Sequence, residues 1–275
     1  MPSQNEKAVA FRALHQTGTF VIPNPWDIGT ARLLAHLGFA ALATTSAGFA
    51  FSRGRPDGAV TRKETMKHAR EIVGATDLPV SADLENGFGD APREAAETIR
   101  QAAAAGLVGG SIEDATGRKD DPIYEHARAV ERVRAAVEAA RRLPFPFMLT
   151  ARAENFLWGR PDLADTIRRL QAFQEAGADV LYAPGLKTRE EIATLIRAVD
   201  RPVNILAGIP GALGVAELAE IGVRRISIGG SLARAALGAV LKAGHEMRES
   251  GSFGFAGTAP SGREINGIFA GWGKD

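Results

Sequence analysis

Residues 79–114 read PVSADLENGFGDAPREAAETIRQAAAAGLVGGSIED. An apolar run at 79–85 is followed by an Ala-rich segment at 91–105 with apolar residues at helical spacing, and then by a second apolar run at 109–114. Pro92 near the start of the middle segment and Gly106 just after it are residue types expected at the two ends of a helix. The stretch therefore predicts a strand, a helix and a second strand, which is the repeating unit of a parallel sheet.

The same alternation extends over the whole chain. Eight runs are almost continuously apolar or small until their last residues, as is typical of parallel strands covered on both faces. They span residues 19–24, 41–45, 79–85, 109–114, 147–153, 180–185, 203–207 and 225–230, and helical patterns stand between them, for example at 91–105, 122–142, 161–176 and 215–221. Eight such units without a linker predict a single (β/α)8 TIM-barrel domain over residues 1–275. A doubly wound open sheet is the alternative that fits the same strands.

The end of the chain departs from this pattern. Residues 252–261 are rich in Gly, Ser and Phe, and residues 263–272, REINGIFAGW, have the pattern of a short apolar helix. An apolar helix outside a closed barrel needs a surface to cover it. We therefore expect a helical extension over about 252–275 that packs on its own barrel or on a neighbouring subunit.

Composition excludes several classes of protein. The 33 basic and 32 acidic side chains leave a net charge of +1, so nothing indicates nucleic acid or an anionic membrane as a partner. The absence of cysteine excludes disulfides, thiolate metal sites and a cysteine nucleophile. No apolar run reaches the ~18 residues of a membrane helix, and the N-terminal residues show no signal-peptide pattern. A cytoplasmic protein is expected.

Acidic residues stand where two neighbouring predicted strands end. Asp83 and Glu85 are two residues apart, so on a strand both side chains would point to one face, and Glu113 ends the next strand. Three ionised carboxylates at one barrel mouth repel one another unless a cation lies between them. All-oxygen ligation favours Mg²⁺, with Mn²⁺ as the other candidate, over Zn²⁺. Ion pairing with Arg152 or a shared proton are the alternatives.

Other polar and small residues follow the remaining strands. Arg152 ends the fifth predicted strand, where its guanidinium could grip a substrate carboxylate in a bidentate manner. Backbone N–H groups of Ser46, Ala47 and Gly48 could hold the same anion, because small residues allow close approach. Further candidates for substrate binding are Asn204 and Gly208. The glycines at 208–214 and 229–230 also have the character of a barrel phosphate site, and a phosphate-binding barrel of unrelated family is one alternative.

Several motifs together resemble the isocitrate lyase/phosphoenolpyruvate mutase superfamily. They are TTSAGFAFSRGRPDG at 44–58, VSADLENGFGD at 80–90, GGSIEDATG at 109–117, LTARAENF at 149–156 and EAGADVLYAPGL at 175–186. The resemblance runs from about residue 11 to about residue 236. Here the family motif Asp-x-Asp-x-Gly-[Phe/Tyr]-Gly carries Glu85 in place of the second Asp.

The resemblance implies roles for particular residues. It implies that Asp83, Glu85 and Glu113 bind Mg²⁺, that residues 46–48 form the carboxylate-binding turn, and that Arg152 is the carboxylate-binding arginine. Asp57 matches an acid that the family places near the reacting carbon or the leaving group. The implied fold is a (β/α)8 barrel whose last helix is often exchanged between subunits, which would make a homodimer or homotetramer.

The sequence also departs from the family. The lyases carry a Cys- and His-containing loop after the fourth strand, whereas residues 115–122 read ATGRKDDP. Lys119 could stand in for a lysine of the phosphonopyruvate enzymes, but their Asn-Ser pair is missing. Residues 182–185, YAPG, replace the acid or the His-Ser pair expected after the sixth strand. Acid–base chemistry by the lyase loop is therefore not expected.

Among the reactions of this family, decarboxylation depends least on the acid–base residues that this sequence lacks. A metal chelated by a 2-oxo acid stabilises an enolate as a Lewis acid, CO₂ leaves without a general acid, and water or Tyr182 can supply the proton. We therefore expect a Mg²⁺-dependent lyase that acts on a small 2-oxo (di)carboxylic acid, in the manner of oxaloacetate decarboxylase. Phosphonopyruvate-type P–C cleavage with Asp57 as an acid is the second hypothesis. The third is a protein that binds pyruvate, oxaloacetate or 2-oxoglutarate with little turnover.

Overall fold

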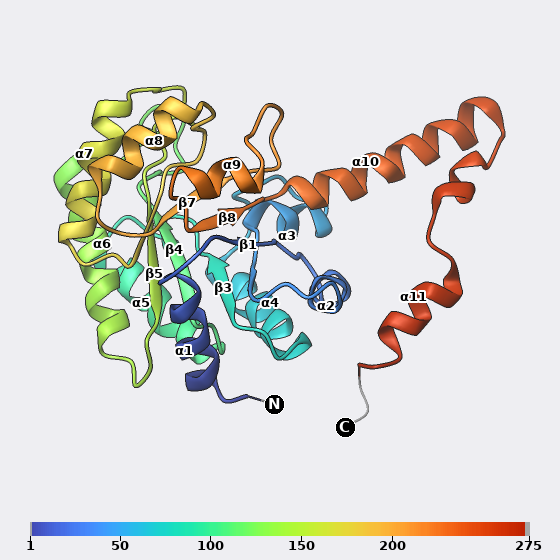
Figure 1. The fold of residues 1–275 in the computed structure, drawn as a ribbon, viewed down its shortest axis with the longest axis horizontal. Helices are drawn as coiled ribbons and strands as arrows, with labels where there is room; N and C mark the ends of the chain where they lie inside the picture. The colour runs from blue at the N-terminus through green and yellow to red at the C-terminus, as the bar shows by residue number, and fades with distance from the viewer. Residues whose placement is uncertain (1, 273–275) are drawn as a thin grey trace.

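Eight short strands, all parallel, form a sheet that curves into a barrel (Figure 1). They are β1 (Phe20–Ile22), β2 (Leu42–Ala43), β3 (Val80–Asp83), β4 (Gly109–Glu113), β5 (Met148–Arg152), β6 (Val180–Tyr182), β7 (Val203–Leu206) and β8 (Arg225–Ser227). Each strand from β2 to β8 pairs with its neighbour in sequence, and β8 pairs with β1. The Ala43 N–H donates to the Pro23 carbonyl at 3.1 Å and links β2 to the end of β1. This computed structural model describes residues 2–272, and its nearly closed (β/α)8 barrel confirms the predicted fold.

Seven helices cover the outside of the barrel. They are α2 (Ile28–His36), α4 (Arg62–Ala75), α5 (Pro92–Ala104), α6 (His126–Arg141), α7 (Leu163–Glu175), α8 (Arg189–Ala198) and α9 (Val215–Glu220). The prediction that a helix begins at residue 122 was wrong by one turn. Residues before 126 are held in extended conformation, because Ala115 and Ile123 form an antiparallel bridge that closes the loop after β4.

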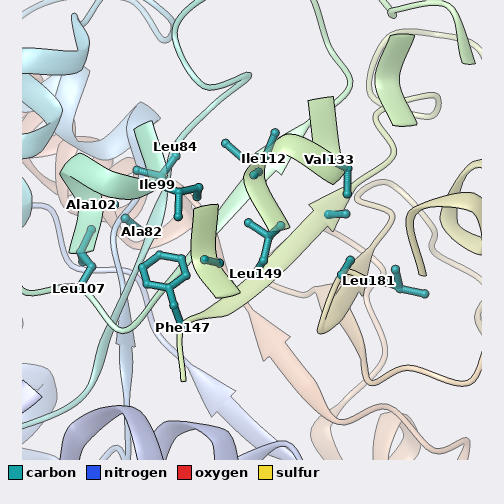
Figure 2. Packing of buried hydrophobic residues seen from close by; sticks show 14 of the residues in the cluster. Ala82, Leu84, Ile99, Ala102, Leu107, Ile112, Val133, Phe147, Leu149 and Leu181 are labelled. Carbon is teal, nitrogen blue, oxygen red and sulfur yellow. The ribbon is translucent and has the colours of Figure 1, made fainter. Parts of the chain in front are cut away.

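The core lies between the strands and these helices. Figure 2 shows Leu84, just after β3, with Ile112 of β4 and Leu149 of β5, packed with Ile99 of α5 and Val133 of α6. A second apolar cluster closes the opposite, amino end of the barrel, where Phe11 of α1 (Gln4–Leu14) is fully buried against the first residues of the strands. The carboxyl end of the barrel is the end that remains open to carry a site.

The strands are shorter than the sequence predicted, mainly at their carboxyl ends. β3 ends at Asp83 and not at Glu85, and β8 ends at Ser227 and not at Gly230. A turn follows β3 directly, in which the Gly87 N–H donates to the Leu84 carbonyl at 2.9 Å. Asp83 and Glu85 therefore do not share one face of a strand, and the orientation of Glu85 is set by the turn.

The C-terminal extension begins earlier than predicted. α10 (Ser231–His245) follows β8, and only its Ala233 is buried, so the helix runs away from the barrel (Figure 1). The chain continues through η1 (Glu246–Ser250) and η2 (Gly254–Thr258) and turns back through α11 (Gly262–Phe269). Contacts with α2 place α11 on its own barrel, with the Arg32 guanidinium 5.7 Å from the Trp272 ring. The extension thus comprises most of α10 as well as residues 246–272; residues 273–275 of the predicted segment lie outside the described part.

Among residues 2–272, no helix has the length and apolar character needed to cross a membrane.

Candidate active site

A cavity of about 1390 Å³ opens at the carboxyl ends of the strands. Nine of the eleven residues that the sequence singled out line it: Ser46, Ala47, Asp57, Asp83, Glu85, Glu113, Arg152, Tyr182 and Asn204. The other two residues, Gly48 and Gly208, are not among those that line the cavity. A side chain on Gly48 would meet Thr45 and Trp26 at 2.6 and 3.1 Å, and the Gly208 carbonyl accepts a hydrogen bond from the Ser231 hydroxyl at 2.7 Å. The fold thus brings most of the predicted residues to one place.

Arg152 is the centre of the site. Its guanidinium lies 3.0 Å from Asp83, 3.2 Å from Glu113 and 2.8 Å from Glu154. Its side chain is only 13% exposed, so these charged hydrogen bonds are made in a poorly solvated environment. The ion pairing that the sequence left open as an alternative to a metal is therefore present in this structure.

Glu154 is the residue of this cluster that sequence reasoning missed. It follows β5 by two positions, is 3% exposed, and accepts from both Nε and Nη2 of Arg152. Its backbone N–H donates to Asp114 at 2.8 Å, which fixes the chain just beyond the strand. The available signal was its place next to a strand end, but sequence alone did not show that it faces Arg152.

Asp83 contacts the groups that were predicted to bind a substrate carboxylate. Its Oδ2 accepts from the Ser46 hydroxyl at 2.8 Å and from the Ser46 N–H at 3.2 Å, while Oδ1 accepts from Arg152. Residues 46–48 are also not an open turn, because they form the first turn of α3 (Ser46–Ser52), where the Thr45 hydroxyl caps the Gly48 N–H. In this structure two of the three predicted anion-binding amides thus have partners within the protein.

Asp57 reaches the same cluster from the loop after α3. Its Oδ1 accepts from the Gly58 N–H at 3.0 Å and lies 3.2 Å from the Ser46 hydroxyl oxygen, whose single proton can serve either Asp57 or Asp83. Burial, followed by the charge of Asp83, raises the pKa of Asp57. A carboxyl group with a raised pKa in a cavity is suited to holding or releasing a proton.

Glu85 lies in a left-handed turn, with φ of 49°. Its Oε1 is buried and has no hydrogen-bond partner among residues 2–272. Burial and then the charges of Asp83 and Asp57 raise the pKa of Glu85 to about 8. Burial likewise raises the pKa of Glu113 well above its usual value, even though Arg152 opposes the shift. The site therefore holds more carboxyl groups than the Arg152 guanidinium can pair with as carboxylates.

A divalent cation fits this surplus of carboxylate oxygen. The unpartnered Glu85 Oε1, together with Asp83 and Glu113, offers the oxygen ligands that Mg²⁺ prefers. Within the described residues, however, no three acidic or histidine side chains are arranged around a common point that could hold a metal as they stand. Arg152 lies between Asp83 and Glu113 and pairs with both, so the guanidinium engages their carboxylate oxygens in this structure.

Tyr182 lies beside Arg152 on the neighbouring strand β6 and lines the cavity. The Arg152 guanidinium lies 5.1 Å from the Tyr182 ring centroid, close enough for a cation–π contact. Burial raises the pKa of Tyr182 to about 12, with the positive charge of Arg152 acting in the opposite direction. The phenol is therefore neutral near pH 7 and retains a proton that it can donate.

The loop after β4 is closed on itself and tied to the loop after β3. Thr116 N–H donates to the Pro122 carbonyl at 2.8 Å, and Arg118 forms an ion pair with Asp90 at 3.0 Å. Thr116 and Gly117 line the cavity, whereas Lys119 is exposed and does not. The structure thus gives no support to Lys119 as a replacement for the lysine of the phosphonopyruvate enzymes.

This combination defines a barrel enzyme whose site, at the carboxyl ends of the strands, is lined by acids around one buried arginine. The profile of the family described as phosphoenolpyruvate phosphomutase matches residues 11–248, which is most of the chain. The chain belongs to the isocitrate lyase/phosphoenolpyruvate mutase superfamily.

Named relatives extend this result. A 2-methylisocitrate lyase of Bacillus subtilis is 32% identical over 75% of this chain and 68% of its own length. An oxaloacetate decarboxylase of Pseudomonas savastanoi pv. phaseolicola is 30% identical over 78% of this chain and 75% of its own length. The relatives are lyases and mutases by name, so the prediction of a lyase-type enzyme of this superfamily is confirmed at that level.

Solved structures agree with the fold. A candidate lyase/mutase from Burkholderia cenocepacia J2315 superimposes with a TM-score of 0.95 and 62% identity, over 97% of this chain and 96% of that chain. A phosphonopyruvate hydrolase, in a complex with oxalate and Mg²⁺, superimposes with a TM-score of 0.85 and 25% identity, over 96% of this chain and 95% of that chain.

Proposed function

We propose that this chain is a divalent-metal-dependent lyase that cleaves a carbon–carbon bond of a small 2-oxo dicarboxylic acid, as in the decarboxylation of oxaloacetate. The main support for the proposal is the site around Arg152. Its guanidinium can bind a substrate carboxylate, and the acidic side chains around it can supply oxygen ligands to a metal ion. The loop over this site has neither Cys nor His, so a reaction that needs no acid at the leaving group suits it best. The oxaloacetate decarboxylase relative supports the same choice.

Each residue has a task in this reaction. Arg152 grips the carboxylate next to the oxo group and orients the substrate, and the Ser46 hydroxyl and N–H are released to the same carboxylate when Asp83 turns toward a cation. Asp83, Glu85 and Glu113 would hold the cation, which when bound would supply positive charge that stabilises the developing enolate. The bond to the remote carboxylate then breaks, its electron pair stays on the substrate as an enolate, and CO₂ leaves.

The enolate carbon must then take up one proton. The Tyr182 phenol is neutral, buried and in contact with Arg152, so it can hold that proton close to the substrate. Thr116 and Gly117 of the loop after β4, with Trp158 of the loop after β5, line the mouth of the cavity and limit the access of water. Addition of one proton and loss of CO₂ convert oxaloacetate to pyruvate.

The test is pyruvate release from oxaloacetate, corrected for the spontaneous background. We expect turnover with Mg²⁺ or Mn²⁺, loss of turnover with a chelator, and a decrease of about 100-fold in Glu113→Gln, because that change removes a charge that holds the cation. Glu138→Gln, at an exposed position of α6, is the matched control and should retain full activity. Background rates in the wild type with metal present would refute the decarboxylase assignment.

A second candidate is cleavage of a phosphorus–carbon bond. It is favoured by the position of Asp57, whose carboxyl group has a raised pKa and touches Ser46 at the edge of the cluster, and by the phosphonopyruvate hydrolase relative. Release of inorganic phosphate from phosphonopyruvate, lost in Asp57→Asn, would support it. If neither reaction proceeds while pyruvate, oxaloacetate or 2-oxoglutarate still raises the melting temperature in the presence of metal, the chain binds 2-oxo acids without turning them over.

We further propose that the chain works as a homodimer or homotetramer in which the C-terminal extension reaches a neighbouring subunit. α10 leaves the barrel with Val240 and Leu241 exposed by 68% and 65%, and Phe253 beyond it is exposed by 66%. Apolar side chains on a helix that projects from its own barrel are the usual mark of a surface that another subunit covers.

A further inference from the structure

Arg225 lies at the floor of the cavity, one layer below Arg152. It is the first residue of β8, is 6% exposed, and lines the cavity from beneath. Its Nε donates to the side-chain amide oxygen Oδ1 of Asn204 at 2.9 Å, and its Nη2 donates to the Thr150 hydroxyl at 2.9 Å. Because β8 and β5 are not neighbours in the sheet, this side chain crosses the interior of the barrel.

The charge of Arg225 has no counterion within the protein. Among residues 2–272 it forms no ion pair, since the acidic residues at the mouth contact Arg152 instead, and its Nη1 is buried without a hydrogen-bond partner. The groups that face it are neutral hydroxyl, amide and phenol groups, with the cationic Arg152 above it. Burial lowers the pKa of Arg225 to about 10, which still leaves the guanidinium charged near pH 7.

A buried charge without a partner is costly, because several kcal/mol of hydration are lost and no ion pair replaces them. Hydroxyl groups compensate only in part. The remaining N–H of Arg225 is a strong donor to an anion that enters the cavity, and a bound anion would offset both the charge and the missing hydrogen bond. Arg225 is one of the residues that line the cavity, so an anion bound at the cavity floor would lie next to its guanidinium.

The two arginines line the same cavity, so each can hold one end of a short diacid. Thr150, which accepts from Arg225, lies two residues before Arg152 on β5 and on the same face of the strand, so the Arg225 guanidinium lies deeper in the barrel than Arg152. One carboxylate held at Arg152 would leave the other end of a four-carbon diacid directed at the floor. A monocarboxylate of the same length would bring an apolar methyl group against the buried charge.

We infer that Arg225 is a specificity-determining residue that binds the second carboxylate of the substrate and makes the site selective for dicarboxylates over monocarboxylates. The inference rests on the proposed function for the identity of the substrate, but the selectivity can be measured without turnover.

The test compares binding of succinate and butyrate by calorimetry in chloride-free buffer. The two ligands have the same carbon skeleton and differ by one carboxylate. We expect wild type to bind succinate at least about 10-fold more tightly than butyrate. In Arg225→Met the affinity for succinate should fall by about 10- to 100-fold, the loss expected for hydrogen bonds to a charged group, while the affinity for butyrate stays the same or improves. Arg224→Met changes the same residue type at the adjacent position of the chain and is the matched control.

A second variant separates the loss of the proposed ligand contact from a general disturbance of the fold. Asn204→Asp has nearly the same shape, and its carboxylate would pair with Arg225 Nε in place of the ligand. It should therefore remove the preference for succinate while the fold is preserved, as judged by its circular dichroism. An unchanged ratio of the two affinities in both variants would overturn the inference and leave Arg225 as a structural support for Asn204 and Thr150.

Measuring chloride binding distinguishes a site for diacids from a site for small inorganic anions. If chloride binds in an Arg225-dependent manner but succinate retains its affinity in Arg225→Met, the floor takes an inorganic anion and the selectivity assignment is wrong. If the preference for succinate depends on Arg225 but oxaloacetate is not decarboxylated, the proposed reaction fails and this inference stands.

Discussion

At the scale of single residues, the charged side chains inside the barrel differ in how they are paired and how deeply they are buried. Arg152 is surrounded by three carboxylates, whereas Arg225 below it has only neutral partners. The next titratable group toward the amino end is His15, which is 4% exposed and lies between Phe11 and Phe20. Burial, and then the positive charge of Arg225, lowers the pKa of His15 to about 3. The histidine is therefore neutral in the folded protein.

This shift predicts a specific pH dependence of stability. The pKa of His15 in the unfolded chain is near 6.5, so between pH 6.5 and about 3 the unfolded state takes up a proton that the folded state rejects. The free energy of unfolding should therefore fall as pH is lowered, by at most about 1.4 kcal/mol per pH unit from this residue. In His15→Gln this contribution disappears, so the stability advantage of wild type over the variant should shrink between pH 6.5 and 4.

Urea unfolding of both proteins measures the effect. Measurements at pH 8 are the internal control, because histidine is neutral there in both states. An advantage of wild type that stays constant down to pH 4 would show that His15 can be protonated in the folded barrel.

At the scale of elements, the loop after β3 is held in place by one buried arginine of α6. Arg132, which is 1% exposed, donates to the carbonyl oxygens of Asn86, Gly89 and Asp90, and its guanidinium lies 4.3 Å from the ring of Tyr124. Glu85 and Phe88 in this loop have positive φ, which is unfavourable for residues other than glycine. The contacts of Arg132 thus stabilise the strained turn that points Glu85 into the cavity.

Arg132→Lys should therefore weaken both stability and activity. A single ammonium group cannot reach all three carbonyls, and each buried carbonyl left without a donor costs about 1–3 kcal/mol, so we expect a loss of about 2–4 kcal/mol in the free energy of unfolding. Activity should fall further than stability alone explains at temperatures where the variant is still folded. Arg128→Lys, at an exposed position on the same helix, is the control and should change stability by less than about 0.5 kcal/mol. Equal stability of the two variants would refute this role of Arg132.

At the scale of the whole molecule, the most conspicuous feature is α10, which leaves the barrel and carries exposed apolar side chains (Figure 1). If a neighbouring subunit covers this surface, Val240→Glu combined with Leu241→Glu should weaken self-association by at least about 10-fold, because burying two new charges in an apolar interface is costly. Sedimentation velocity over a range of protein concentrations measures the change. Lys242→Glu, an exposed polar position on the same helix, is the matched control. A wild type that sediments as a monomer would refute the proposed assembly.

The sequence by itself determined the eight parallel strands and predicted a cavity at their carboxyl ends. Parallel strands that are buried on both faces must be nearly continuously apolar, and this requirement made eight of them visible in the chain. Because a barrel brings the carboxyl ends of its strands together, residues as far apart as Ser46, Asp83 and Arg152 could be assigned to one cavity before any contact was known.

Only the tertiary structure decided which charge pairs with which, and where the extension goes. The contact of Arg225 with Thr150 joins residues 75 positions apart, and it depends on the curvature of the sheet and on side-chain rotamers that no local pattern encodes. The left-handed turn at Glu85 and the direction of α10 depend in the same way on packing against distant elements. Electrostatic interactions fall off with distance and change with burial, and both quantities exist only once the chain is folded.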